Sequence, residues 1–267
     1  MNIETKFLVE TALLTHGLKS IANERLIELW PWKHRCIAWV HKGEVIIGDI
    51  EEFISFRESA KELIRIDRDI FMESCNKSIS GALTASGTMM AAKERGIHIA
   101  VTAGMGGIGD IVGEELCADL PAIATMNVTL IATSPKDVID IEGTIEWLLK
   151  HDVSIWGRDT DTIDGFMVTH RPIKFTGKYN GQPLKGQTLL LNPIPNEMRL
   201  KDLTIIEKSK AAGKEAEKRG EYYHPAANAM IDTLSYGKSS ELQLRSLIEN
   251  SIWADELTRK KDYFTTD

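Results

Sequence analysis

Residues 97–109 read IHIAVTAGMGGIG, a short apolar run that passes directly into a turn with four glycines. Helical and extended patterns alternate around this stretch at the spacing that βαβ units need. The predicted strands cover residues 97–102, 128–133 and 153–157, and the predicted helices cover residues 84–95, 114–125 and 135–150. This alternation predicts an α/β fold whose sheet is largely parallel and covered by helices.

The flanking sequence adds a β-hairpin and further helices. Two apolar runs, residues 36–40 and 44–48, enclose His41-Lys42-Gly43, which is the layout of a hairpin. A last buried strand begins at Leu189 and ends in a turn bounded by two prolines. The remaining predicted helices cover residues 20–30, 51–63, 197–220 and 239–259. Because no repeat or low-complexity linker divides the chain, we expect a single domain over residues 1–267.

Composition and charge exclude several classes of protein. The chain of 267 residues is 43% hydrophobic and carries a formal net charge of −7, values typical of globular proteins. An acidic chain lacks the electrostatic attraction on which nucleic-acid binding depends, so we expect no nucleic-acid polymer as a partner. No apolar run reaches the roughly 18 residues that span a bilayer, and the N-terminus lacks the layout of a signal peptide. We therefore expect a cytoplasmic protein with no membrane partner.

The glycine-rich turn formally matches the dinucleotide-binding fingerprint, as Gly104-x-Gly106-x-x-Gly109. The acidic residue that would bind a ribose hydroxyl about 20 positions further on is missing. The turn is followed by acidic side chains that disfavour a phosphate, namely Asp110, Glu114, Glu115 and Asp119. A nicotinamide-dependent oxidoreductase is therefore less favoured than the two functions considered below.

The acidic segment after this turn is a candidate metal site. Glu115 and Asp119 lie four positions apart, so a helix over residues 114–125 would place both carboxylates on one face. Paired carboxylates suit Mg²⁺ or Mn²⁺ better than zinc. A solvated acidic face without a metal is the commoner explanation of such a pair.

Lys136 lies at the predicted start of the helix over residues 135–150. Ser134 as N-cap, Pro135 in the first turn and Asp137 in a capping box fit that start. The positive end of a helix dipole disfavours a cation, so the neutral, nucleophilic amine would be favoured there. A surface lysine that lies across the helix end is the alternative, and the pattern alone supports both equally.

Five motifs occur in an order that resembles a known family. They are TASGTM (84–89), TAGMGG (102–107), CADL (117–120), PKDVID (135–140) and NPIP (192–195). Together they resemble the pseudouridine-5′-phosphate glycosidases, also called indigoidine synthase A-like proteins, and the resemblance covers nearly the whole chain. It implies a three-layer α/β/α sandwich with a mixed, largely parallel sheet, and a homotrimer.

The resemblance also implies residue roles. In this family a lysine attacks the sugar and forms an imine, a glutamate donates a proton, and a divalent metal, typically Mn²⁺, lies nearby. Lys136 matches the nucleophile and Glu10 the proton donor, and Glu115 occupies the place of the metal-binding aspartate. The positions that match substrate-binding residues are Ala85, Ser86, Cys117, Ala118, Asp119 and Gln243.

The predicted activity follows from these roles. We expect the protein to cleave, or reversibly form, the carbon–carbon bond between a base and ribose 5-phosphate in a C-nucleoside 5′-phosphate such as pseudouridine 5′-phosphate. A C-glycosidic bond offers no oxygen leaving group to protonate, unlike the substrate of an ordinary glycosidase. An imine acts as an electron sink, so an amine nucleophile with a general acid suits the reaction.

The chain departs from the family pattern at several positions. The family sequence GGVHR is replaced by GGIGD at residues 106–110, and Ile64 or Arg65 stands where a substrate-binding lysine is expected. Gln243 replaces an active-site asparagine. Apart from His16, the histidines, His224 among them, lack metal-like spacing and have no assigned role. These departures support an alternative function, a non-catalytic or repurposed member that binds a sugar phosphate.

Overall fold

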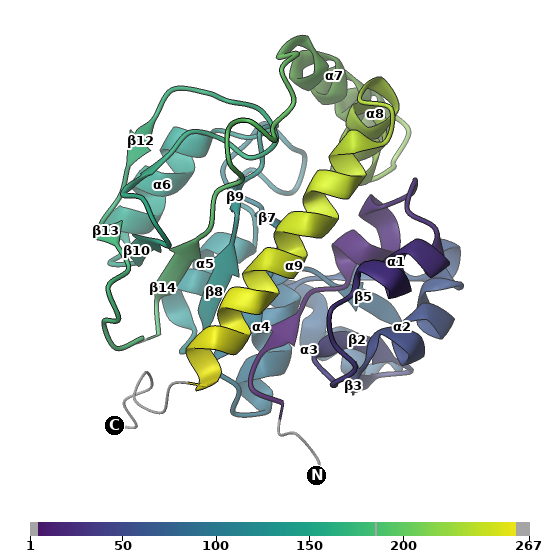
Figure 1. The fold of residues 1–267 in the computed structure, drawn as a ribbon. Helices are drawn as coiled ribbons and strands as arrows, with labels where there is room; N and C mark the ends of the chain where they lie inside the picture. Colours follow the sequence, from purple (N-terminus) through teal and green to yellow (C-terminus); the bar gives the residue numbers. More distant parts are fainter. Residues whose placement is uncertain (1–4, 185, 260–267) are drawn as a thin grey trace.

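A ten-stranded sheet forms the centre of the protein, as the computed structural model of residues 5–184 and 186–259 shows (Figure 1). Nine strands follow the order β13-β10-β14-β8-β6-β1-β2-β5-β4. The tenth strand, β3, pairs with β2 outside this order. The ten strands are β1 (Leu8–Val9), β2 (Ile37–His41), β3 (Glu44–Gly48), β4 (Ile64–Ile66), β5 (Gly81–Leu83), β6 (Ile99–Val101), β8 (Thr129–Ala132), β10 (Ser154–Gly157), β13 (Gly177–Lys178) and β14 (Thr188–Leu191).

Most neighbouring strands in this sheet are parallel. The antiparallel pairs are the β2–β3 hairpin and β2 with β5. Two further sheets have two strands each: β7 (Gly104–Met105) with β9 (Ser134–Pro135), and β11 (Thr162–Ile163) with β12 (Ile173–Lys174). The mixed, largely parallel sheet expected from the sequence is confirmed.

Both faces of the sheet are buried, and successive side chains of a strand enter different cores. In β6, Ile99 and Val101 belong to one core and Ala100 to the other. In β14, Leu190 joins the first core, while Leu189 and Leu191 join the second. This alternation is the period-2 geometry of a strand, and strands covered on both sides need apolar residues at every position.

The helices form one layer on each face. The first core is covered by α1 (Asn23–Leu29), α2 (Ile50–Arg57), α7 (Thr204–Lys218), α8 (Tyr223–Leu234) and α9 (Lys238–Arg259). The second is covered by α3 (Arg68–Asn76), α4 (Ala85–Glu94), α5 (Asp119–Thr125) and α6 (Ile141–Lys150). Figure 1 shows α9 crossing the sheet in front, with α4 and α5 behind it. The three-layer α/β/α architecture is therefore confirmed. None of the helices in the described part of the chain has the length and apolar character needed to cross a membrane.

Several predicted elements form for the expected local reasons. The hydroxyl of Thr84 caps α4 by accepting a hydrogen bond from the Gly87 N–H, and Gly96 follows the helix with a φ of +66°. The β2–β3 hairpin turns through Lys42 and Gly43, which both have positive φ.

Other predicted boundaries are wrong. The helix expected over residues 114–125 begins only at Asp119, because the preceding residues fold back on the glycine-rich turn. There the Cys117 N–H donates to the Gly107 carbonyl at 3.0 Å, which keeps this stretch extended. The helix expected over 197–220 begins at Thr204. The helix expected over 51–63 ends at Arg57 and is followed by the short 3₁₀ turn η2 (Ala60–Glu62).

Candidate active site

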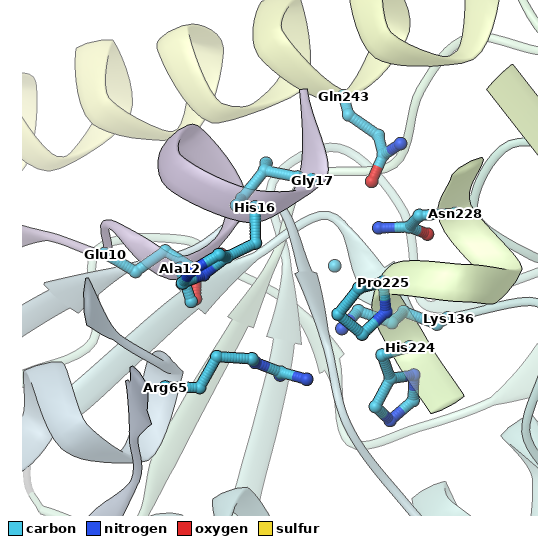
Figure 2. A pocket seen from close by; sticks show the side chains of 12 residues that line it. Glu10, Ala12, His16, Gly17, Arg65, Lys136, His224, Pro225, Asn228 and Gln243 are labelled. Carbon is cyan, nitrogen blue, oxygen red and sulfur yellow. The ribbon is translucent and has the colours of Figure 1, made fainter. Parts of the chain in front are cut away.

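A pocket lies at the carboxyl ends of several parallel strands, where open α/β sheets bind ligands. Its residues come from segments far apart in the sequence, and Figure 2 shows their side chains converging on one space. The lining residues are Glu10, Ala12, Leu13, His16, Gly17, Arg65, Gly104, Lys136, His224, Pro225, Asn228 and Gln243. Three of the predicted site residues, Glu10, Lys136 and Gln243, therefore share this pocket.

Lys136 is held by strand pairing and not by a helix start. Ser134 and Pro135 form β9, and the Lys136 N–H continues this pairing by donating to the Met105 carbonyl at 3.1 Å. Helix α6 begins five residues later at Ile141, with Asp140 as its N-cap. The predicted capping box around Lys136 is therefore wrong, and the helix-dipole argument no longer applies to its amine.

Asp137 has a tertiary role in place of the predicted cap. Its side chain is fully buried and accepts hydrogen bonds from the backbone N–H groups of Phe166, Met167 and Val168, and from Nε2 of His170. Phe166 packs so closely on Gly104 that a Cβ there would lie 2.6 Å from its ring. Asp137, which directly follows Lys136, thus connects the chain at Lys136 to the loop that packs against the pocket residue Gly104.

Glu10 follows β1, and its N–H donates to the Val101 carbonyl at 3.0 Å. Only 6% of the residue is exposed. Burial raises the pKa of the carboxyl to about 7, although the positive charge of Lys136 opposes this rise; the carboxylate of Asp119 adds to it. Near neutral pH a large fraction of Glu10 is therefore protonated and can donate a proton.

Two cationic side chains in the pocket remain available to an anion. Within residues 5–184 and 186–259, neither Lys136 nor Arg65 forms an ion pair within 4.0 Å. Arg65 lies in β4, and Figure 2 shows its guanidinium extending towards the side of the pocket that holds Lys136 and His224. A guanidinium in such a position suits a phosphate or carboxylate group.

His224, which lies on the side of the pocket away from Glu10 in Figure 2, forms a hydrogen-bonded pair with Glu114. Nε2 of His224 lies 3.2 Å from a carboxylate oxygen of Glu114, and the histidine is 5% exposed. Burial lowers the pKa of His224 to about 4, helped by the charges of Lys136 and Arg65 and opposed by Glu114. Burial alone would raise the pKa of Glu114, but the hydrogen bond from His224 and the cations Arg65 and Lys136 lower it to about 2. At neutral pH a neutral imidazole therefore donates to a carboxylate.

Asp119 holds together two backbone segments, one of which is the glycine-rich turn that begins at the pocket residue Gly104. Its two carboxylate oxygens accept hydrogen bonds from the N–H groups of Ser86 at 2.9 Å and Gly106 at 2.8 Å. A Cβ at Gly106 would overlap Sγ of Cys117, so only glycine fits there. Both oxygens of Asp119 thus hold the N-terminus of α4 against the glycine-rich turn.

These contacts rule out the dinucleotide interpretation of the turn. The Gly106 N–H, which would face a pyrophosphate, is already bound to Asp119. The turn also leads into a loop instead of directly into a helix, since α5 starts at Asp119. The nicotinamide hypothesis therefore loses its structural support.

The other predicted substrate-binding residues do not line the pocket. Ala85 and Ser86 are buried at the start of α4. Cys117 and Ala118 immediately precede α5 and are partly buried. Burial raises the pKa of the Cys117 thiol well above its ordinary value, so the thiol stays protonated. None of these four lines the pocket, and their roles in substrate binding stay predictions.

Polar atoms without partners point to a ligand on the helical side of the pocket. Gln243 of α9 is 1% exposed, and its Nε2 has no hydrogen-bond partner within the described ranges. Figure 2 shows the amides of Gln243 and Asn228 facing the same space. Nε2 of His16 contacts the carbonyls of Ala60 and Leu63, while its Nδ1 is buried and unpaired within the same ranges.

The predicted metal ligand does not join this group. Glu115 is exposed in the loop before α5, and its carboxylate accepts a hydrogen bond from the Gly113 N–H at 3.4 Å. The part of the chain that the structure describes contains no cluster of three His, Cys, Asp or Glu side chains suited to a metal ion. The residues present therefore do not fit a site for Mn²⁺ at Glu115, and the expected metal remains a prediction from resemblance.

Arg65 is one of the two residues at the place of the substrate-binding lysine that the family pattern leads us to expect, but three other pocket residues, His224, Pro225 and Asn228, were missed by sequence reasoning. All three belong to α8, a helix absent from the sequence prediction. The only available signal was the spacing of His224 and Asn228, which are four positions apart and so share one helix face.

Comparisons with known proteins agree with this architecture. A pseudouridine-5′-phosphate glycosidase of Geobacillus kaustophilus is 29% identical over 198 residues, which cover 67% of this chain and 66% of that relative. An indigoidine synthase A-like protein of Thermotoga maritima superposes with a TM-score of 0.78 at 20% identity, over 96% of this chain and 93% of that chain. Prealnumycin C-glycosynthase AlnA, solved in complex with ribulose 5-phosphate, superposes with a TM-score of 0.73 at 21% identity, over 96% and 91% of the two chains. These two structures share the fold. The family model for indigoidine synthase A like proteins matches residues 9–259, and the chain belongs to that family.

Proposed function

We propose that the protein is a C-glycosidase that cleaves, or reversibly forms, the carbon–carbon bond between a base and ribose 5-phosphate. Pseudouridine 5′-phosphate is the proposed substrate, as the name of the Geobacillus kaustophilus relative suggests. The observation that carries the proposal is one pocket that brings Lys136, free of ion pairs among the described residues, together with Glu10, whose pKa is about 7.

Lys136 acts as the nucleophile in this proposal. Its amine nitrogen forms a bond to the anomeric carbon of the sugar and loses a proton, while the ring oxygen leaves that carbon and gains a proton. The nitrogen lone pair then forms an imine, and the electron pair of the carbon–carbon bond passes to the base. Glu10 protonates the base carbon, and water hydrolyses the imine to release ribose 5-phosphate and restore the amine and the acid.

Arg65 is the proposed contact of the 5′-phosphate. It is the second cation of the pocket, and a guanidinium matches phosphate geometry better than an ammonium does. The buried amide of Gln243, whose Nε2 has no partner among the described residues, is the proposed contact of the base. We derive no step through a metal ion, since Glu115 and its surroundings do not form a site for one.

Borohydride trapping tests the proposal directly. The protein is incubated with ribose 5-phosphate, reduced with borohydride and digested, and mass spectrometry locates the adduct; in parallel, release of uracil from pseudouridine 5′-phosphate is followed by chromatography. We expect the adduct on Lys136, and its loss in Lys136→Met but not in Lys150→Met, a matched change at an exposed lysine of α6. Tight binding of the sugar phosphate with neither adduct nor turnover would instead support the alternative, a sugar-phosphate-binding protein without catalysis.

A further inference from the structure

One polar pair has no part in the mechanism above: His224, which lines the pocket, and Glu114, which does not line it but is hydrogen-bonded to His224. His224 is the second residue of α8, lines the pocket and is 5% exposed. Its Nε2 lies 3.2 Å from Oε2 of Glu114, which belongs to the loop after the glycine-rich turn. A buried titratable pair at a pocket, with its imidazole held in one orientation by a carboxylate, is a candidate for chemistry.

The proposed reaction leaves one proton transfer without a carrier. When the Lys136 nitrogen bonds to the anomeric carbon, it must release a proton, and the departing ring oxygen must accept one. Glu10 is already assigned to the base carbon, on the far side of the pocket from His224 in Figure 2. A group beside the amine that both accepts and returns a proton would complete the step.

We propose that His224, positioned by Glu114, carries this proton from the Lys136 amine to the ring oxygen of the sugar. This inference rests on the lysine chemistry of the proposed function. In the step, the amine loses one proton and imidazole becomes imidazolium; the carbon–oxygen bond breaks, the ring oxygen takes the proton, and the imidazole is neutral again. No oxidant, reductant or further reactant is consumed.

The geometry of the pair suits a proton carrier. A carboxylate that accepts the Nε2–H fixes the tautomer, so Nδ1 carries the lone pair and can act as the base. Glu114 also stabilises the imidazolium that forms, as the carboxylate does in other histidine–carboxylate pairs. Glu114 therefore acts as a positioning residue, while His224 would contact the reacting atoms.

The charges around His224 favour proton transfer once substrate is bound. The charged groups that face it are Glu114 from the loop, Lys136 after β9 and Arg65 of β4, and the Tyr223 ring packs edge-on at 5.5 Å. After burial, the two cations are what lower its pKa. A phosphate bound to Arg65 neutralises one of them, and Lys136 attacks as the neutral amine, which removes the other before the step begins, so both conditions raise the basicity of the imidazole.

The test measures how fast borohydride-trappable imine forms with ribose 5-phosphate over a range of pH. We expect His224→Ala to slow trapping about 100-fold, the usual scale of general acid–base catalysis, and added imidazole to restore part of the rate. Glu114→Gln should slow trapping about tenfold and change its pH profile. His224→Gln, which keeps a donor towards Glu114 and fills the space, should be as slow as His224→Ala.

A matched control separates proton transfer from simple tethering. Glu217 of α7 accepts a hydrogen bond from the Val112 N–H at 2.7 Å and so joins the same loop to the neighbouring helix. Glu217→Gln weakens this tie without touching the proton path, and its trapping rate should stay within threefold of the wild type. Trapping by His224→Gln at the wild-type rate, or a loss in His224→Ala that imidazole does not restore, would overturn the inference. Absence of any Lys136 adduct in the wild-type protein would refute the proposed function itself.

Discussion

Replacing Glu10 by glutamine should stabilise the protein above neutral pH, although it removes the proposed proton donor. Burial shifts the carboxyl pKa from its ordinary value of 4.5 to about 7, so the folded protein holds this proton more tightly than the unfolded chain does. The stability that the protonated acid provides is fully present below pH 4.5 and is lost as the pH rises through about 7. Glutamine keeps the shape of the neutral acid and cannot ionise.

The size of the effect follows from the pKa values. Each pKa unit represents 1.36 kcal/mol, so a rise from 4.5 to about 7 corresponds to about 3 kcal/mol. Glu10→Gln should therefore raise the free energy of unfolding by about 3 kcal/mol at pH 8 but by only about 1 kcal/mol at pH 5. Comparing variant and wild type at each pH cancels the effect of every other group that titrates alike in both.

Urea denaturation at pH 5, 6.5 and 8 measures this difference. Glu51→Gln is the matched control, because Glu51 is exposed on α2 and its replacement should change stability by less than about 0.5 kcal/mol at each pH. A Glu10→Gln variant that is equally stable, or less stable, at pH 8 than the wild type would refute a raised pKa for this carboxyl. It would also remove the physical basis for Glu10 as a proton donor near neutral pH.

Four other changes probe the rest of the site. Asp137→Asn leaves one acceptor oxygen where two now accept from four donors. Urea denaturation should therefore show a free energy of unfolding lower by about 2–4 kcal/mol. Asp140→Asn is the control and should be nearly neutral, because asparagine and aspartate are equivalent N-caps of α6. Gly106→Ala should lower the free energy of unfolding by about 1–3 kcal/mol, because the added methyl overlaps a buried thiol sulfur. Arg65→Met should raise KM for pseudouridine 5′-phosphate by about 10- to 100-fold while the unphosphorylated nucleoside is affected much less; equal effects on both would contradict a phosphate contact. Glu115→Ala should leave binding of Mn²⁺, measured by its free-ion paramagnetic resonance signal, within twofold of the wild type, and a larger loss would restore the metal role of this residue.

The sequence predicts β2, β3, β6, β8, β10 and β14 of the sheet, but not β1, β4, β5 and β13, because the predicted strands have patterns that depend on local rules. Buried parallel strands such as β8 and β14 are short apolar runs, and α4 has both a hydroxyl cap at Thr84 and a glycine stop at Gly96. Such signals involve neighbouring residues only. The pattern therefore places these elements correctly before any tertiary contact is known.

The error around Lys136 has a tertiary cause. Ser134, Pro135 and Asp137 have the spacing of a helix start, but β9 pairs with β7 and Asp137 binds four donors of the loop after Gly165. Those donors lie about 30 positions away in the sequence, so no local pattern reveals them. The prediction of the nucleophile came from resemblance, and its placement in the pocket came from strand pairing.

The helical wall of the pocket was also beyond local reasoning. Helix α8 has proline as its third residue, and its pocket-facing side chains, His224 and Asn228, are polar residues that a pattern of buried apolar positions assigns to solvent. Lys136, which follows β9, and Arg65 of β4 reach the same space from distant parts of the chain. Only the assembled sheet brings these residues together.

Glu10, which lines the pocket, and Glu114, which holds the pocket residue His224, are chemically alike in the sequence but differ in the fold. Glu10 is buried beside Asp119, and its pKa rises to about 7; Glu114 is one-third exposed, accepts a hydrogen bond from His224 and faces two cations, and its pKa falls to about 2. Carboxyls whose pKa values are driven apart in this way serve different roles, one as a proton donor and one as a permanent anion. A net charge of −7 contains no trace of this difference. The different pKa values of the two glutamates therefore arise from burial and from the charges of Lys136, Arg65 and Asp119, and the proposed division of roles around Lys136 would be lost if the two glutamates exchanged surroundings.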